Sequence, residues 1–186
     1  HQDPDLVADH RPRPAGWRPV FGSSHQALSH LKREGVGPGD LFLFFAWLRP
    51  AEMQAGRWRF VPGAPDFHAL YGWLQVDAVL DVDTPGVRDR LAWARPHPHL
   101  DCAYPPGTNA VYLPRTRLTL PDGTLTDRPG AGVFDRLRPA HRLTADGETR
   151  SRWSLPAFFF HSRAGLSYHR RPDRWQPAPG GRVRLD

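Results

Sequence analysis

The sequence predicts one β-rich α+β domain, built as a closed or half-closed barrel with a few short helices and long ordered loops. At 186 residues, the chain is long enough to bury one core. Its 21 prolines and 17 glycines indicate many turns and disfavour a helical bundle. Residues 70–82 alternate between apolar and mostly polar side chains, which is the period of a β-strand. A barrel is expected because closure leaves few strand edges exposed.

The N-terminal part of the domain is predicted to hold an arm, a helix and a strand. Residues 1–22 are polar and proline-rich, and are expected to pack on the body as an arm anchored by Trp17, Val20 and Phe21. A short helix follows the serine pair 23–24 and ends at Gly35. After a turn over residues 36–40, the apolar run Leu41–Leu48 predicts a strand buried on both faces.

The strand over residues 70–82 has the clearest pattern. Every even-numbered residue is apolar, whereas the odd-numbered ones are mostly polar or amphipathic. One face of this strand should therefore pack inward, while the other meets solvent, a loop or a ligand.

The remaining elements are shorter. A helical turn is expected within residues 83–94, and residues 96–99 should be extended because each histidine there is flanked by proline. Pro121-Asp122-Gly123 is typical of a hairpin turn. The predicted strands are 110–113, 117–120, 124–126, 133–134, 138–144, 158–160 and 182–185.

Charge favours an anionic partner, and nucleic acid or a nucleotide is the expected one. The formal net charge is +6, and all but one of the 25 basic residues are arginines, whose planar guanidinium suits phosphates and base edges. The single cysteine, Cys102, excludes an internal disulfide and a cysteine-based zinc site. No apolar stretch is long enough to span a membrane and no signal peptide is present, so a cytoplasmic protein is expected.

A base-binding surface is predicted on the mixed face of the 70–82 strand. Trp73 lies there beside Tyr71 and Gln75, and Trp47 is a candidate for a second stacking ring. Tryptophans are more often core or loop anchors than stacking platforms, and that alternative stays open for each of them.

Histidines supply the candidate polar and acid–base groups. His97 and His99, two apart in an extended segment, should point the same way and can bind a metal if His68, His169, His1 or a carboxylate completes the site. They can equally donate hydrogen bonds or move protons beside a bound base, or form a polar loop. No metal signature is complete, so we assign no metal ligands and no cofactor.

Two further polar positions are candidates for the site. Asn109 offers an amide edge for a base, although asparagine more often closes a turn. His1-x-Asp3 with Asp5 forms an acid–imidazole cluster, for which a solvated terminus is the commoner interpretation. No catalytic signature is complete, so no catalytic residue is assigned.

The segments Gly39-Asp40 with residues 41–45 and Leu70–Val76 with its central Gly72 resemble the core of PUA-like barrels, the group that includes ASCH and EVE domains. Those domains hold RNA or modified bases. The resemblance implies a PUA-like barrel and a nucleic-acid or modified-nucleotide ligand.

The whole chain also resembles a bacterial family, the third of the nucleotide modification associated domains, described as DNA base hypermodification proteins. The motifs that carry the resemblance are His1-x-Asp3-Pro4-Asp5-Leu6, Gly35–Phe45, His68-x-x-Tyr71–Val76, Pro96–His99, Asn109-x-x-Tyr112, Gly130–Phe134, Trp153-x-Leu155-Pro156 and Leu166–His169. Members carry a strand-like segment before the His-x-Asp motif, so we expect natural residues to precede His1.

Three functions follow, in order of preference. The first is binding of nucleic acid or a modified nucleotide in a DNA base modification system, with the base between Trp73, Tyr71 and Trp47 and with His68, His97, His99 and Asn109 as polar edges. The second is an enzyme of base modification that uses a histidine-based site, which includes His169 as a candidate. The third is a scaffold for protein partners of a modification system.

Overall fold

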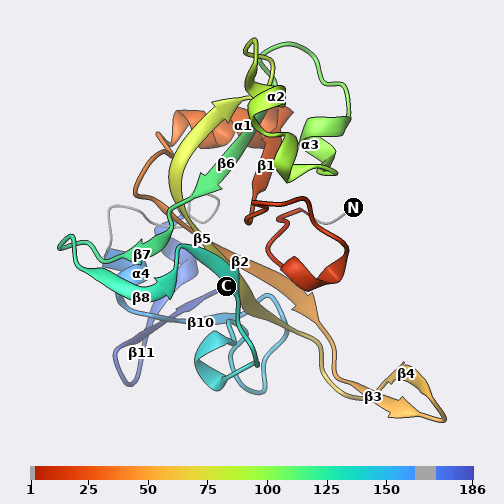
Figure 1. Cartoon of the computed structure of the whole chain (residues 1–186). Coiled ribbons are helices and arrows are strands. Elements are labelled where there is room, and N and C mark those ends of the chain that lie inside the picture. Colours follow the sequence, from red (N-terminus) through yellow and green to blue (C-terminus); the bar gives the residue numbers. More distant parts are fainter. Residues whose placement is uncertain (1–2, 162–170) are drawn as a thin grey trace. The chain divides into compact units, whose positions relative to one another are not determined.

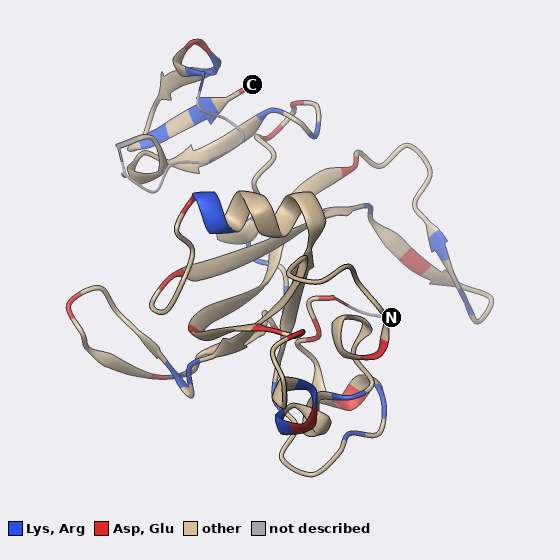
Figure 2. Ribbon diagram, turned by 90° about the horizontal axis from the view of Figure 1, so that it is seen from above, with Lys and Arg blue, Asp and Glu red and all other residues tan. Residues whose placement is uncertain are grey.

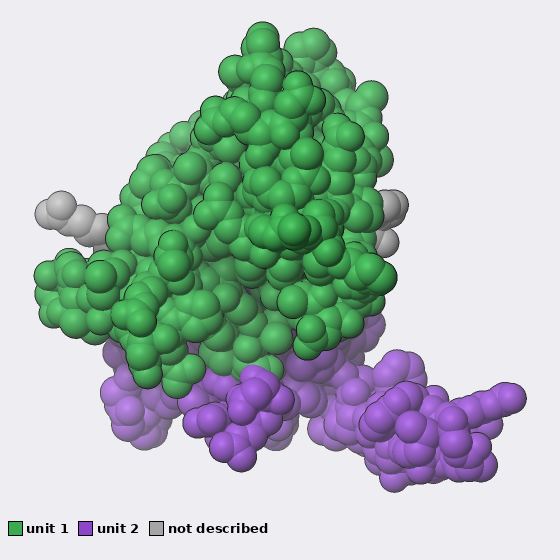
Figure 3. Space-filling model, in the orientation of Figure 1, with its two compact units in different colours: residues 1–43, 72–134 green, residues 44–71, 135–186 purple. Residues whose placement is uncertain are grey.

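The computed structural model describes residues 3–161 and 171–186, and the chain forms two compact units (Figure 3). Unit 1 comprises His1–Leu43 and Gly72–Phe134, and unit 2 comprises Phe44–Tyr71 and Asp135–Asp186. Two of the three boundaries between the units fall within strands, β2 (Leu41–Leu48) and β5 (Phe67–Asp81), and the third follows Phe134. The single domain over residues 1–186 stays a prediction.

Short strands dominate both units (Figure 1), which confirms the predicted β-rich α+β class. The strands are β1 (Phe21–Ser24), β2 (Leu41–Leu48), β3 (Ala51–Gln54), β4 (Arg57–Phe60), β5 (Phe67–Asp81), β6 (Asn109–Pro114), β7 (Arg117–Thr119), β8 (Leu125–Pro129), β9 (Ala131–Val133), β10 (Trp153–Pro156), β11 (Trp175–Ala178) and β12 (Arg182–Leu185). The helices are α1 (His25–Arg33), α2 (Val87–Arg90), α3 (Pro98–Asp101) and α4 (Phe158–His161), with 3₁₀ turns η1 (Ala8–His10), η2 (Ala92–Ala94), η3 (Pro139–His141) and η4 (Pro172–Arg174). Among the described residues, no helix has the length and apolar character needed to cross a membrane.

The largest sheet is curled, as a PUA-like half-barrel requires, and has the order β1-β6-β5-β2 with β9 also paired to β5. The β1–β6, β5–β6 and β5–β9 pairs are antiparallel. In the β1–β6 register, Ser24 lies opposite Asn109. Smaller sheets are formed by β10-β12-β11 and by the β3–β4 and β7–β8 hairpins. The β7–β8 hairpin confirms the turn predicted at Pro121-Asp122-Gly123.

Each unit has an apolar core. In unit 1 one core cluster consists of Val20, Val82, Val87, Leu91, Ala94, Leu100, Val111 and Leu113. In unit 2 it consists of Leu143, Trp153, Leu155, Val183 and Leu185. Burial of each large apolar side chain contributes about 1.5–3 kcal/mol, so these clusters hold the short strands together.

The strand β2 differs from its prediction. Its residues alternate between exposed and half-buried, and Leu41, Phe45 and Trp47 are exposed. The expectation of a strand buried on both faces is wrong, because β2 lies at the end of the sheet order and only one of its faces is covered. An apolar run indicates a strand but does not show what lies across each face.

Three other expectations are wrong. Within residues 138–144, the 3₁₀ turn η3 begins at Pro139, a residue that favours the first position of a helix. Among the residues that the structure describes there, only Arg142 and Thr144 pair as a strand would, in isolated β-bridges. Residues 158–160 begin the helical turn α4, in which the Phe160 N–H donates to the Ala157 carbonyl at 3.0 Å. Residues 96–99 are not extended throughout, because α3 begins at Pro98.

Candidate functional site

The proline-flanked histidines form one side of the candidate site. His97 is extended and caps α3, and Pro98 occupies the first turn, where its missing N–H costs nothing. The His99 N–H donates to His97 Nδ1 at 3.3 Å, and the two ring centroids are 5.7 Å apart. A helical turn, rather than an extended pair, therefore brings the two imidazoles together.

Asn109, the first residue of β6, fixes the orientation of the His99 ring. Its amide Nδ2 donates to the His99 carbonyl at 2.7 Å, so its Oδ1 faces the ring and lies 2.5 Å from His99 Nδ1. His99 Nδ1 therefore carries the proton and donates it. Both residues are buried, and the opposite ring nitrogen, Nε2, is the one that faces the third member of the cluster.

That third member is the Asp3 carboxylate. Its Oδ2 lies 3.1 Å from His99 Nε2, and its Oδ1 accepts from the Gly22 N–H at 2.9 Å. His97 Nε2 lies 3.6 Å from Oδ1, beyond hydrogen-bonding distance, and is buried without a hydrogen-bond partner in the described part of the chain. The Asp3 side chain is 23% exposed, so the cluster meets solvent at this carboxylate.

The electrostatics of the cluster favour an ion pair. Burial alone would raise the pKa of Asp3, but interactions with His97, His99 and the Gly22 N–H outweigh it and lower that pKa to about 2. Burial alone would lower the pKa of His99, but its hydrogen bonds with Asp3 and Asn109 raise that pKa above 6.5. The pair can therefore store a proton on an imidazole beside an ionised carboxylate.

Close packing sets the position of the His99 ring. A Cβ at Gly22 would lie only 2.1 Å from His99 Cδ2, so no larger residue fits there without moving the ring or β1. The ring also stacks on Tyr104, with centroids 5.2 Å apart and an interplanar angle of 6°. Contacts with Gly22 of β1 and with Tyr104 thus both restrict the imidazole.

A second cluster lies in unit 2 around His68. The Trp153 Nε1–H donates to His68 Nδ1 at 3.0 Å, and Phe45 makes an edge contact with each of these rings. Burial and the charge of Arg150 lower the pKa of His68, and the nearby Asp66 only partly opposes them. His68 is therefore held neutral, with its Nδ1 as an acceptor.

Trp47 lies in the same unit and is 62% exposed. Its Nε1–H donates to Asp66 Oδ2 at 2.7 Å, and the Arg150 guanidinium lies 4.1 Å from its ring centroid. Arg150 also pairs with Asp66 at 2.9 Å. The indole is thus held in place while much of its surface stays open to solvent.

A family model described as nucleotide modification associated domain 3 matches residues 1–186, the entire chain. The protein belongs to this family. No curated protein and no solved structure matches the chain.

The predicted residues of this nucleotide modification associated domain 3 protein fall into separate places. His97, His99 and Asn109 lie together in unit 1, whereas His68 and Trp47 lie in unit 2. His169 lies outside the described residues. Their roles in binding stay predictions.

At Trp73 and Gln75, the mixed face of β5 is covered by residues of the strands β7, β8 and β9. Trp73 is 9% exposed, donates from Nε1 to the Pro129 carbonyl at 3.0 Å and packs on Gly132. Gln75 is 6% exposed and bonds both the N–H and the carbonyl of Thr119. Tyr71 is half-buried and lies 6.2 Å from Phe44, measured between ring centroids.

Sequence reasoning did not select Asp3, Gly22 or Tyr104. The sequence signal for Asp3 is the His1-x-Asp3 motif, for which a solvated terminus is the commoner interpretation. Gly22 and Tyr104 carried no sequence signal, since their roles depend on packing against His99. In the described part of the chain, no group of three His, Cys, Asp or Glu residues is arranged to hold a metal ion.

Proposed function

We propose that this protein binds nucleic acid or a modified nucleotide within a DNA base modification system. Family membership supports a role in nucleotide modification. The observation that carries the binding role is an exposed aromatic surface on the β3–β4 hairpin of unit 2.

The register of the hairpin places its apolar side chains on one face. Met53 lies opposite Trp58, and Ala51 lies opposite Phe60. Trp58 is 71% exposed and Phe60 is 62% exposed. These rings contribute little to the core, and stacking with unpaired bases would remove them from water.

Arginines accompany these rings. Arg57 and Arg59 alternate with Trp58 and Phe60 along β4, so they project from the other face of the hairpin. The Arg49 guanidinium lies 5.0 Å from the Phe60 ring centroid. Proteins that bind single-stranded nucleic acids combine aromatic rings, which stack on the bases, with neighbouring guanidinium groups, which contact the phosphates.

Fluorescence anisotropy with labelled single-stranded DNA and RNA tests this function. Trp58→Ala and Phe60→Ala should each weaken binding by about 1–3 kcal/mol, because each removes one stacking surface. Leu125→Ala, which truncates a 64% exposed side chain on β8 of unit 1, is the matched control and should bind normally. The proposal fails if the wild type binds neither strand, and it also fails if the hairpin variants bind as the control does. Dimerisation through the hairpin without nucleic-acid binding would point to a protein-binding role instead.

The Asp3–His99–Asn109 cluster favours a second function, catalysis of base modification. A raised imidazole pKa beside an ionised carboxylate fits general acid–base chemistry, and Asp3 is the exposed member. Mass spectrometry of nucleosides from cells that express the protein tests this. A modified nucleoside that appears with the wild type and is absent with a stably folded His99→Gln variant supports catalysis. An unchanged nucleoside profile with the wild type counts against it.

A further inference from the structure

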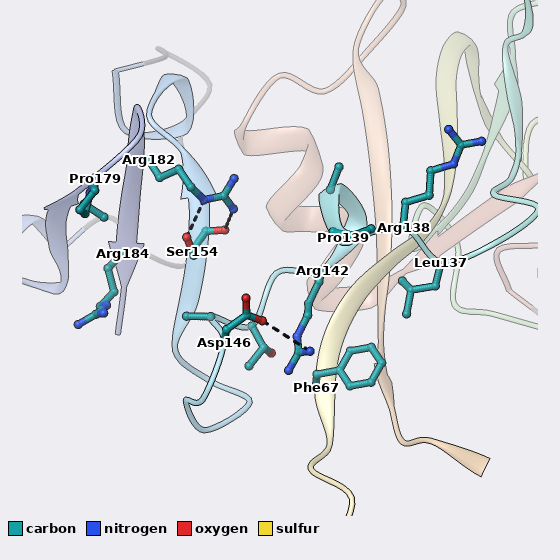
Figure 4. A pocket seen from close by; sticks show the side chains of 14 residues that line it. Phe67, Leu137, Arg138, Pro139, Arg142, Asp146, Ser154, Pro179, Arg182 and Arg184 are labelled. Atoms are coloured by element: carbon teal, nitrogen blue, oxygen red, sulfur yellow. Dashed lines mark hydrogen bonds and ion pairs between the residues drawn. The ribbon is translucent and has the colours of Figure 1, made fainter. Parts of the chain in front are cut away.

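A pocket of unit 2 is rich in arginine (Figure 4). Its volume is about 830 Å³, and its lining includes four guanidinium groups and one carboxylate, from Arg138, Arg142, Arg182, Arg184 and Asp146. We infer that this pocket binds the phosphate groups of a single-stranded nucleic acid, away from the aromatic hairpin. The inference rests on the proposed function, because it names a second contact for the same ligand.

Arg142 has unused hydrogen-bonding capacity. Its Nε is buried and has no hydrogen-bond partner in the described part of the chain, and its guanidinium lies 4.9 Å from the Phe67 ring centroid. The nearest carboxylate, Asp146, is 3.7 Å away and its side chain is 96% exposed, so solvent weakens this pair. The terminal nitrogens of Arg142 thus face a weakened partner, and an anionic oxygen in the pocket would give them a stronger, charge-assisted hydrogen bond.

Arg182 and Arg184 are placed by the alternation of β12. They lie on one face of the strand, while Val183 and Leu185 enter the core on the other. Figure 2 shows basic segments on this strand, which leads to the C-terminus. Arg182 Nε donates to Ser154 Oγ at 2.7 Å, a neutral acceptor that orients the guanidinium without cancelling its charge. The nearest carboxylate to Arg184 is that of Glu148, at 3.9 Å.

The four charges do not converge on one point. Arg182 and Arg142 lie toward the middle of the pocket, whereas Arg184 and Arg138 extend from its opposite ends (Figure 4). A site for one phosphate needs donors that meet at a single group of oxygens. Separated guanidinium groups match the successive phosphates of a strand, and each contact with a phosphate releases a counterion.

The salt dependence of binding to a labelled oligothymidylate of about a dozen nucleotides tests the inference. Arg142→Gln and Arg184→Gln should each reduce the slope of log K against log salt concentration by about 0.7. At 0.1 M salt this corresponds to about a fivefold loss of affinity for each contact. The controls are Arg90→Gln and Arg128→Gln, which make the same charge change at exposed positions of unit 1 and should leave the slope unchanged.

The outcomes separate this inference from the proposed function. If the wild type binds and Trp58→Ala weakens binding, but the pocket variants have the slope of the controls, the pocket is not a strand contact and the proposed function stands. If the wild type binds no strand, both are wrong. Inorganic phosphate is then added as a competitor of the labelled oligonucleotide. If it displaces the oligonucleotide at a concentration equal to that of the oligonucleotide's own phosphate groups, the pocket is a single-anion site and the strand assignment is wrong. Arg184→Gln, on an exposed side chain, keeps the test informative if Arg142→Gln misfolds.

Discussion

His99 Nε2 lies 3.1 Å from Asp3 Oδ2, although the two residues are far apart in the sequence. The contact forms because β1 carries Gly22 to the His99 ring, and the Gly22 N–H holds the other oxygen of Asp3. Asn109 orients the ring from the opposite side. The position of the N-terminal arm and the protonation of a buried imidazole are therefore coupled.

Asp3→Asn should change the dependence of stability on pH. The depressed pKa of Asp3 stabilises the fold above pH 3.8, and this is lost as the pH falls toward 2. The raised pKa of His99 stabilises the fold below pH 6.5, and this is lost as the pH rises through the folded-state pKa. Removing the carboxylate should flatten the stability curve on both its acid and its alkaline side and lower the pKa of His99. It should also reduce the free energy of unfolding by about 1–3 kcal/mol near pH 5.

Urea unfolding from pH 2 to pH 9, with NMR titration of His99, measures these effects. Asp9→Asn, at an exposed position of η1, is the control and should keep the wild-type profile. An Asp3→Asn protein with an unchanged His99 pKa would show that the two groups are not coupled.

Gly22→Ala should disrupt the site by steric overlap. The added Cβ would lie 2.1 Å from the His99 ring, so the ring or β1 must move, at a cost of about 1–3 kcal/mol or more. Gly37→Ala is the matched control, because its Cβ would meet nothing closer than the Gly35 carbonyl at 3.8 Å. Thermal unfolding should show a clear loss for Gly22→Ala and a change within about 0.5 kcal/mol for Gly37→Ala. Equal stability of the two variants would contradict this packing.

Local patterns predicted much of the fold. The alternation in residues 70–82 and the turn at Pro121-Asp122-Gly123 depend on neighbouring residues alone, and both are confirmed. The exposure of β2 depends on which elements cover each face, which a run of apolar residues does not encode. Residues 158–160 are aromatic and favour a strand by propensity, yet the turn after β10 makes them helical.

Less of the site could be predicted. The spacing of His97 and His99 singled out the pair, but their geometry depends on a helical turn at Pro98 rather than on an extended segment. Asp3 joins them only through the pairing of β1 with β6, a tertiary relationship. The pattern of β5 left open whether solvent, a loop or a ligand covers Trp73, and the structure places the end of β8 there, at Pro129.

Gln75→Leu tests whether this buried amide serves structure or ligand binding. Its Oε1 accepts from the Thr119 N–H at 2.7 Å, and its Nε2 donates to the carbonyls of Thr119 and Gly39. Each buried group left without a partner costs about 1–3 kcal/mol, so chemical denaturation should show a large loss. Gln176→Leu, at an exposed position of β11, should be nearly neutral. A stable Gln75→Leu protein that loses nucleotide affinity would instead make Gln75 a binding residue.

His68 should titrate below its ordinary range and lose its contact with Trp153 when protonated. Burial and Arg150 lower its pKa, and a proton on Nδ1 would oppose the indole N–H that now donates to that atom at 3.0 Å. The depressed pKa means that this contribution to stability is complete above pH 6.5 and falls as the pH decreases. Arg150→Gln should therefore raise the pKa of His68 in an NMR titration, since the remaining Asp66 favours the protonated form. Arg171→Gln, which removes a guanidinium from an exposed ion pair, is the control and should leave the pKa of His68 unchanged. An equal change of the His68 pKa in both variants would rule out a specific effect of Arg150.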